Sequence, residues 1–202
     1  MLIGNDIVAL NEKQNLKSFN RPGYLMKFSF PSEQRRCKDL ETNSTAFLWS
    51  LKESTYKLIQ KYLNVNIFNP KDFYLLTCKA SSDVITSTIE YTPGNLLLTG
   101  NTFTNRDYVH TITLLKQEHL TQCQHKVIRY DASEPQEMIS TRLKKALAEH
   151  VGSRLNIYDT SQINIVKNRH GIPCISLSKN IIPDISLSHD GEFGAYVYLC
   201  AL

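Results

Sequence analysis

The stretch FLWSLKESTYKL, residues 47–58, contains two charged side chains whose spacing could support chemistry. Glu53 and Lys57 are four residues apart, so a helix would place them on one face. Such a pair is ordinarily a surface ion pair worth about 0.3–0.5 kcal/mol. The apolar residues around it, with the single tryptophan Trp49, instead predict a largely buried helix. A carboxylate and an ammonium at its edge would suit a metal ion and a phosphate, respectively.

Two further segments carry groups that could take part in the same chemistry. Asp6 lies in the apolar stretch GNDIV, where a carboxylate costs free energy unless it is exposed, hydrogen-bonded or bound to a cation. Near the other end, SLSHDG places Ser188 and His189 where an alternating strand meets a turn. Taken singly, a strand-end cap and a solvated histidine would explain these segments. The sequence lacks the phosphate-loop, dinucleotide, zinc-protease and nucleophile-elbow motifs.

The elements that must position these residues are a first strand and a long helix. Residues 2–9 predict a strand, and a helix is expected from Asn43 or Ser44 to about Leu63. Ser32 is the expected N-cap of a short helix before it. Four β-rich runs separated by turns then predict an antiparallel meander, at residues 72–80, 84–91, 95–103 and 108–115.

The remainder of the sequence predicts one more helix followed by strands. Ser133 is the expected cap of that helix and Gly152 its expected stop. Strands are expected at residues 162–168 and 175–180, and a closing pair within 184–202. The fold class is therefore α+β, in a single domain of 202 residues.

Composition limits the partners and the compartment. The five cysteines are odd in number, widely spread and without a C-x-x-C pair, which fits a reducing cytoplasm. The sequence contains no run of eighteen apolar residues, so it predicts no membrane-spanning helix. The net charge of +4 is too small to indicate nucleic-acid binding, although seven lysines and arginines between residues 13 and 38 could attract an acidic partner. A nucleic-acid-binding module is the weaker alternative.

The order of the motifs is more informative than any one of them. G-x-D-I-V near the start, W-x-x-K-E-x-x-x-K on the long helix, G-x-P after a late strand and S-L-S-H near the end together resemble the 4′-phosphopantetheinyl transferases. The order is similar to that of the short acyl-carrier-protein synthase type. The resemblance covers about residues 1–65 and 160–202. It implies an antiparallel sheet packed on a long helix, with an inserted β-meander and helix at about 66–158.

The resemblance implies Mg²⁺-dependent transfer of the phosphopantetheine arm of coenzyme A to a serine of an apo carrier protein. By motif position, Asp6 and Glu53 match metal ligands, and Lys57 matches the lysine that neutralises the pyrophosphate. Ser188 and His189 match the segment that contacts coenzyme A. Glu53, His189 or a metal-bound water could each take the proton of the acceptor serine.

The partner implied by the resemblance is an acidic acyl carrier protein, with Arg21 and Lys17 as its contacts. Three residues depart from the family pattern: Asn5, Ala9 and Ile172. A degenerate relative that binds a carrier or coenzyme A without transfer is therefore the alternative. Assembly is open: a homo-oligomer could complete the site, or the insertion could supply a wall, with His110 near coenzyme A.

Overall fold

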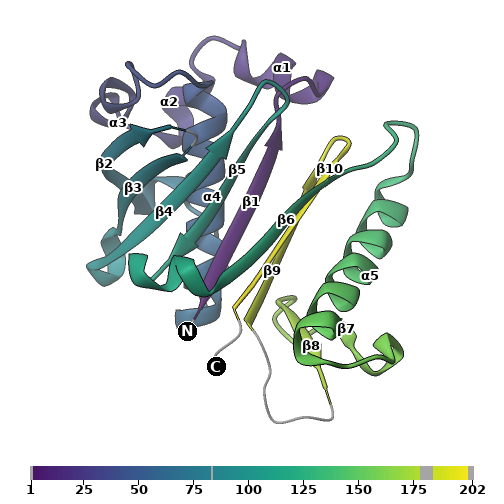
Figure 1. Cartoon of the computed structure of the whole chain (residues 1–202). Coiled ribbons are helices and arrows are strands. Elements are labelled where there is room, and N and C mark those ends of the chain that lie inside the picture. The colour runs from purple at the N-terminus through teal and green to yellow at the C-terminus, as the bar shows by residue number, and fades with distance from the viewer. Residues whose placement is uncertain (1, 83, 178–183, 200–202) are drawn as a thin grey trace.

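The computed structural model describes residues 2–82, 84–177 and 184–199. Five strands form one antiparallel sheet in the order β1-β5-β4-β3-β2. Their bounds are β1 Ile3–Ala9, β2 Phe73–Ser81, β3 Val84–Tyr91, β4 Leu96–Thr104 and β5 Tyr108–Leu114. The four consecutive strands β2 to β5 confirm the predicted meander. It joins β1 in one sheet, so this part of the expected insertion is continuous with the first strand (Figure 1).

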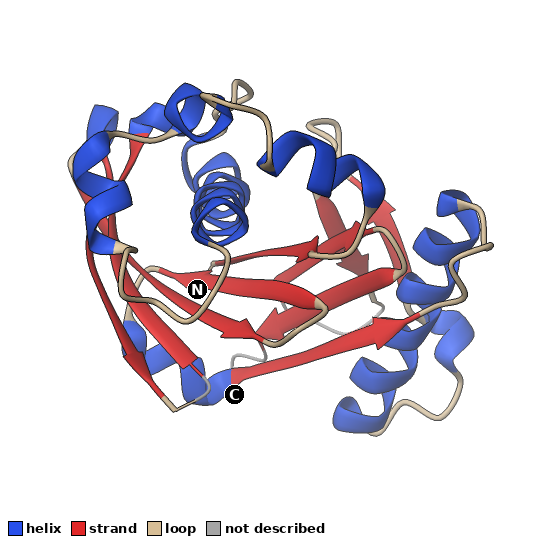
Figure 2. Cartoon of the chain, turned by 90° about the horizontal axis from the view of Figure 1, so that it is seen from above, coloured by secondary structure: helices blue, strands red, loops and turns tan. Residues whose placement is uncertain are grey.

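The long helix α4, Ser44–Leu63, packs against this sheet and contacts β1, β5, β4 and β2. Its predicted start is confirmed by Asn43, whose side chain accepts hydrogen bonds from the backbone N–H of residues 45 and 46. Asn64 ends it in the left-handed conformation, with φ of 55°. Seen from above, α4 is viewed end-on, between the strands and the short helices (Figure 2). A buried apolar row holds it in place, made of Phe47, Leu48, Leu51, Leu58 and Ile59.

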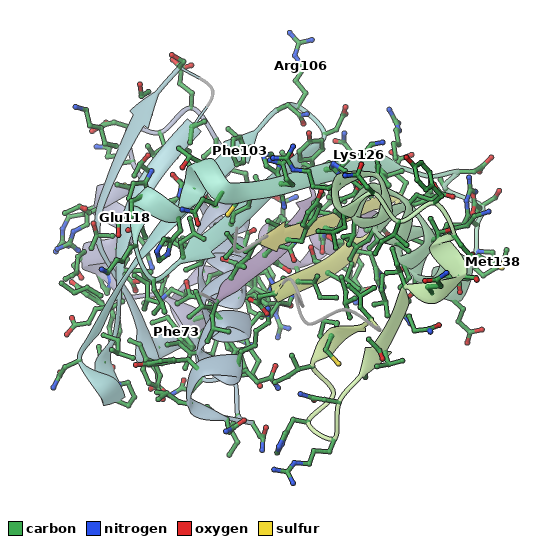
Figure 3. The ribbon with its side chains drawn as sticks, turned by 60° about the horizontal axis from the view of Figure 1, so that its bottom comes forward. Phe73, Phe103, Arg106, Glu118, Lys126 and Met138 are labelled. Carbon is green, nitrogen blue, oxygen red and sulfur yellow. The ribbon has the colours of Figure 1, made fainter. Side chains whose placement is uncertain are left out.

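A second, smaller sheet has the order β6-β10-β9. Its strands are β6 Cys123–Arg129, β9 Asp184–Asp190 and β10 Phe193–Leu199. Helix α5, Gln136–Leu155, packs on it through Leu143, Leu147 and Val151, and a hairpin of β7 Asn164–Lys167 and β8 Pro173–Ser176 lies beside them. Arg106, in the turn between β4 and β5, and Met138, on α5, project outward at the periphery (Figure 3).

The two sheets meet along β1 and β9 through side chains of β9. The backbone N–H groups of Ile3, Asn5 and Ala9 donate to the side chains of Asp184, Ser186 and Asp190, at 2.7, 3.0 and 2.8 Å. The partners in these three bonds are always 181 residues apart, so β9 runs alongside β1 in the same direction. The bonding side chains lie at alternate positions of β9, on the side that faces β1. An edge strand that would otherwise expose unpaired N–H groups is thereby covered. We call this contact the β1–β9 seam.

Some predicted boundaries were wrong for local reasons. Ser32 does not cap a helix but lies inside α3, Pro31–Arg36, whose N-cap is Phe30; the Glu33 carboxylate accepts from Phe30 N–H at 2.7 Å. Ser133 lies in a turn, bonded to Asp131, before α5 begins at Gln136. Gly152 does not end α5, which continues to Leu155. The residue is glycine for close packing, because a Cβ there would lie 3.0 Å from the carbonyl oxygen of residue 157.

Several elements were not predicted at all. These are strand β6, helix α1 at Lys13–Phe19, helix α2 at Tyr24–Phe28, and the 3-10 turns at Pro70–Asp72, Gln117–Gln122 and Thr160–Gln162. The turn predicted between the second and third runs of the meander is a 3-10 turn at Thr92–Gly94. The end of the predicted strand 175–180, and the last three residues of the closing pair, lie outside the described residues. Within the described residues, no helix is long and apolar enough to cross a membrane.

Candidate active site

Three of the predicted site residues form one charged cluster. The Lys57 ammonium lies 2.9 Å from Asp6 Oδ1 and 3.4 Å from Glu53 Oε1. Asp6 faces α4 from β1, because alternate residues of this strand point to opposite sides. Gly4, two residues earlier, permits the close approach: a Cβ there would lie 1.9 Å from the carbonyl oxygen of Ser54. The side chain of Asp6 is 6% exposed, that of Lys57 23% and that of Glu53 30%, so the cluster opens towards solvent on the Glu53 side.

Burial and the Asp6–Lys57 ion pair shift the pKa values of these two residues in opposite directions. Burial raises the pKa of Asp6 to about 7, although the Lys57 ammonium opposes this. Burial alone would lower the pKa of Lys57, but the carboxylates of Asp6 and Glu53 outweigh it and raise the pKa. The second oxygen of Asp6, Oδ2, is buried and has no hydrogen-bond partner among the described residues. An unpartnered carboxylate oxygen favours an additional cation.

The residues present fit a magnesium ion. Within the described chain, no three His, Cys, Asp or Glu side chains converge as a complete set of metal ligands. Mg²⁺ does not require one, because it keeps several waters and binds through one or two carboxylates together with substrate phosphates. The free Oδ2 of Asp6 and the partly exposed carboxylate of Glu53 match that donor set.

On one side, the cluster borders a cationic cavity between the two halves of the chain. The cavity has a volume of about 220 Å³ and is lined by α4, α5, the β7–β8 hairpin and β9. Its charged or titratable lining residues are Lys57, Lys61, Lys144, Lys167 and His189. Ile172 forms part of the apolar wall. We call this the lysine cavity; its chemistry suits a ligand with several phosphates and an apolar portion.

On its other side, the cluster borders a second cavity, also of about 220 Å³. Asp6, Glu53 and His189 line it together with Trp49, and α1 closes it through Gln14, Asn15, Ser18 and Phe19. We call this the α1 cavity. His189 lines both cavities. Partial burial lowers the pKa of His189, and Lys57 and Lys167 lower it further against the opposing charge of Asp190.

Other predicted site residues do not line either cavity. Ser188 is not among the residues that line either cavity, and its hydroxyl is buried without a hydrogen-bond partner among the described residues. Lys17 and Arg21 are exposed, at the end of α1 and just after it, and form no ion pair within the described chain. His110 is buried against Asn5, Phe103 and His125 and lines neither cavity.

The sequence prediction missed three lysines of the lysine cavity. Lys61 is four residues after Lys57, so helical spacing could have placed it on the same face. Its ammonium group donates to the carbonyl oxygens of Ile3 and Ile185 and to both oxygens of Asp184, so most of its hydrogen-bonding capacity is used in the β1–β9 seam. Lys144 and Lys167 come from α5 and β7, and no local pattern connects them with the K-E motif.

A family model described as the 4′-phosphopantetheinyl transferase superfamily matches residues 2–113, which is more than half of the chain. The chain belongs to this superfamily, whose members use coenzyme A as a substrate and typically a metal ion. The match includes Asp6, Glu53 and Lys57 and continues through β2 to β5; His189 lies outside it. No curated protein and no solved structure matches the chain significantly.

Proposed function

We propose that this protein transfers the 4′-phosphopantetheine arm of coenzyme A to a serine hydroxyl of an apo acyl or peptidyl carrier protein, as a holo-acyl-carrier-protein synthase. The observation that carries the proposal is the position of the Asp6–Lys57–Glu53 cluster between two cavities. The lysine cavity has the charge for the phosphates of coenzyme A. The α1 cavity gives the acceptor serine an approach to the same cluster from the other side.

In the proposed reaction, the serine oxygen forms a bond to the β-phosphorus of the pyrophosphate of coenzyme A. The bond from that phosphorus to the bridging oxygen breaks, and adenosine 3′,5′-bisphosphate leaves. Catalysis of such a step depends on positioning and on neutralising charge. Lys57 holds positive charge beside the pyrophosphate, and Asp6 fixes the ammonium by its 2.9 Å ion pair. Glu53 or His189 takes the serine proton, since both line the α1 cavity.

Asp6 and Glu53 would hold the Mg²⁺ ion. When bound, it would supply further positive charge to the pyrophosphate oxygens. The Asp6 carboxylate can bind both cations, because one of its oxygens binds Lys57 and the other has no hydrogen-bond partner among the described residues.

The carrier is proposed to bind over α1 and the segment that follows it. Lys17 and Arg21 are exposed cations there, and an acidic carrier helix would be steered towards them, with a greater effect on the association rate than on affinity. Two exposed apolar side chains, Leu16 (42%) and Met26 (62%), could contribute to the centre of such an interface.

A monomer is the proposed active form. Both walls of the lysine cavity come from one chain, since α4 provides one and α5 with β7 and β8 the other. This supports completion of the site within a single chain. Light scattering with size-exclusion chromatography tests it, and specific activity should be independent of protein concentration.

The function is tested by intact-protein mass spectrometry of apo carrier proteins incubated with this protein, coenzyme A and Mg²⁺. The expected result is a mass gain of one phosphopantetheine group, lost with EDTA and in Asp6→Asn and Glu53→Gln variants. Glu118→Gln is the matched control and should transfer normally, because this carboxylate lies in the 3-10 turn Gln117–Gln122 and its side chain is 71% exposed. If several carriers stay unmodified while coenzyme A binds, the protein is a degenerate relative, and Asn5, Ala9 and Ile172 are the residues to examine.

A further inference from the structure

The end of the β1–β9 seam beside the candidate site is held by two side chains that the reaction scheme does not use. The Asp190 carboxylate accepts from the backbone N–H of Ala9 at 2.8 Å and, through the same oxygen Oδ2, from the side-chain amide of Asn15. That amide also donates to the carbonyl oxygen of Ala9 at 2.9 Å. Asp190 and Asn15 thus bind both outward-facing backbone groups of one β1 residue.

The opposite end of the seam has the same arrangement with different side chains. There Asp184 accepts from the N–H of Ile3 at 2.7 Å, and Lys61 donates to the carbonyl oxygen of Ile3 at 2.7 Å and to Asp184. In both places a carboxylate and a donor side chain enclose the last exposed backbone groups of β1. At the Ile3 end the donor comes from the long, firmly packed α4, whereas at the Ala9 end it comes from α1.

Helix α1 depends on this contact for its position. It has seven residues, too few for a stable isolated helix, and none of them is fully buried. Within the described chain, every side-chain hydrogen bond from α1 to other elements comes from Asn15. At its other end, Phe19 packs beside Trp49 and against Tyr24. Asparagine is also a poor residue inside a helix, so tertiary bonds explain its use here better than local propensity does.

This contact connects the two sides of the candidate site. Asp190 follows His189, which lines both cavities, and Asn15 belongs to the helix that closes the α1 cavity. We propose that Asp190 and Asn15 are a positioning pair that holds α1 against the strand end carrying His189, and thereby sets the carrier-binding side of the site. The inference rests on the proposed function where it concerns the carrier.

Asn15→Ala is the principal test variant. Alanine is the better helix former, so a loss of function would come from the missing tether and not from a weaker helix. Removing a hydrogen bond to a charged carboxylate should raise the KM for the carrier about tenfold, while kcat and the KM for coenzyme A stay within about twofold. Asp190→Asn should act in the same direction. The matched control is Asn11→Ala, because Asn11 precedes α1 and, among the described residues, its side chain bonds to Asp107 and not to Asp190 or Ala9.

Hydrogen–deuterium exchange gives a readout that does not require transfer. In Asn15→Ala the amides of α1 should exchange faster than in the unmodified protein, with α4 and β5 unchanged and Asn11→Ala without effect. Unchanged exchange in α1 would overturn the proposal, as would equal increases in the KM for carrier and for coenzyme A. If the unmodified protein transfers nothing to any carrier, the proposed function fails, and the exchange result alone decides whether the pair holds α1.

Discussion

The K-E motif contains two lysines on one helix that should respond very differently to the same substitution. Lys52 is fully buried, and its ammonium donates to Glu33 at 2.8 Å and to the carbonyl oxygens of Pro70 and Phe73. Its three N–H donors are therefore all used. Glu33 in turn accepts from the backbone N–H of Phe30, just before α3, and from that of Leu75 in β2. Lys57 is five residues further on, on a different face of the helix, at the partly exposed cluster with Asp6 and Glu53.

Lys52→Met should therefore destabilise the protein without a direct effect on transfer. Removing one partner of a buried ion pair costs about 3–5 kcal/mol, because the remaining carboxylate is left buried and unpaired. For a chain of this size, that free energy corresponds to a fall in Tm of about 6–20 °C. Lys57→Met should instead reduce kcat by about 100-fold or more, the size seen when one preorganised charge-stabilising group is removed.

Urea unfolding and transfer kinetics on both variants separate these effects. A double-mutant cycle with Glu33→Gln should give a coupling of at least about 1 kcal/mol between Glu33 and Lys52. The reasoning would be refuted by a Lys52→Met protein that unfolds within about 1 kcal/mol of the unmodified one. It would equally be refuted if folded Lys52→Met lost as much transfer activity as Lys57→Met.

Two further predictions concern other parts of the core. Gly4→Ala should lower the free energy of unfolding in urea by about 3 kcal/mol or more, because its Cβ would meet the backbone of α4. Gly23→Ala should lower it by only about 1–2 kcal/mol, because Gly23 has a φ of 74° but open space around it. Equal effects of the two substitutions would contradict the close packing at Gly4. Burial, with His125 and Lys57, lowers the pKa of His110 from 6.5 to about 3. Between pH 6.5 and about 3 the unfolded chain therefore binds a proton at this group that the folded protein does not, and the free energy of unfolding should fall by about 1.4 kcal/mol for each pH unit within this range. A His110→Phe variant with an unchanged slope of unfolding free energy against pH would contradict this.

Much of the first half of the fold could be predicted because its signals are local. The period of apolar residues and the Asn43 cap predicted α4, and alternation with turn residues predicted β1 to β5. The spacing of Glu53 and Lys57 predicted their common face, and the structure adds Asp6 to it. Helix α5 was predicted with the wrong ends, because Gly152 is used for close packing inside the helix and not for a turn after it.

The sequence by itself determined which residues carry charge and which of them share a helix face, as Glu53 and Lys57 do. It did not determine that Lys52 points into a buried ion pair while its neighbour Glu53 faces the site, since both possibilities satisfy the helical period. Nor did it show that alternate side chains of β9 would bind the free edge of β1, 181 residues away. Contacts at such separations depend on how the two sheets pack, so only the tertiary structure decided how the seam, the lysine cavity and the position of α1 are formed.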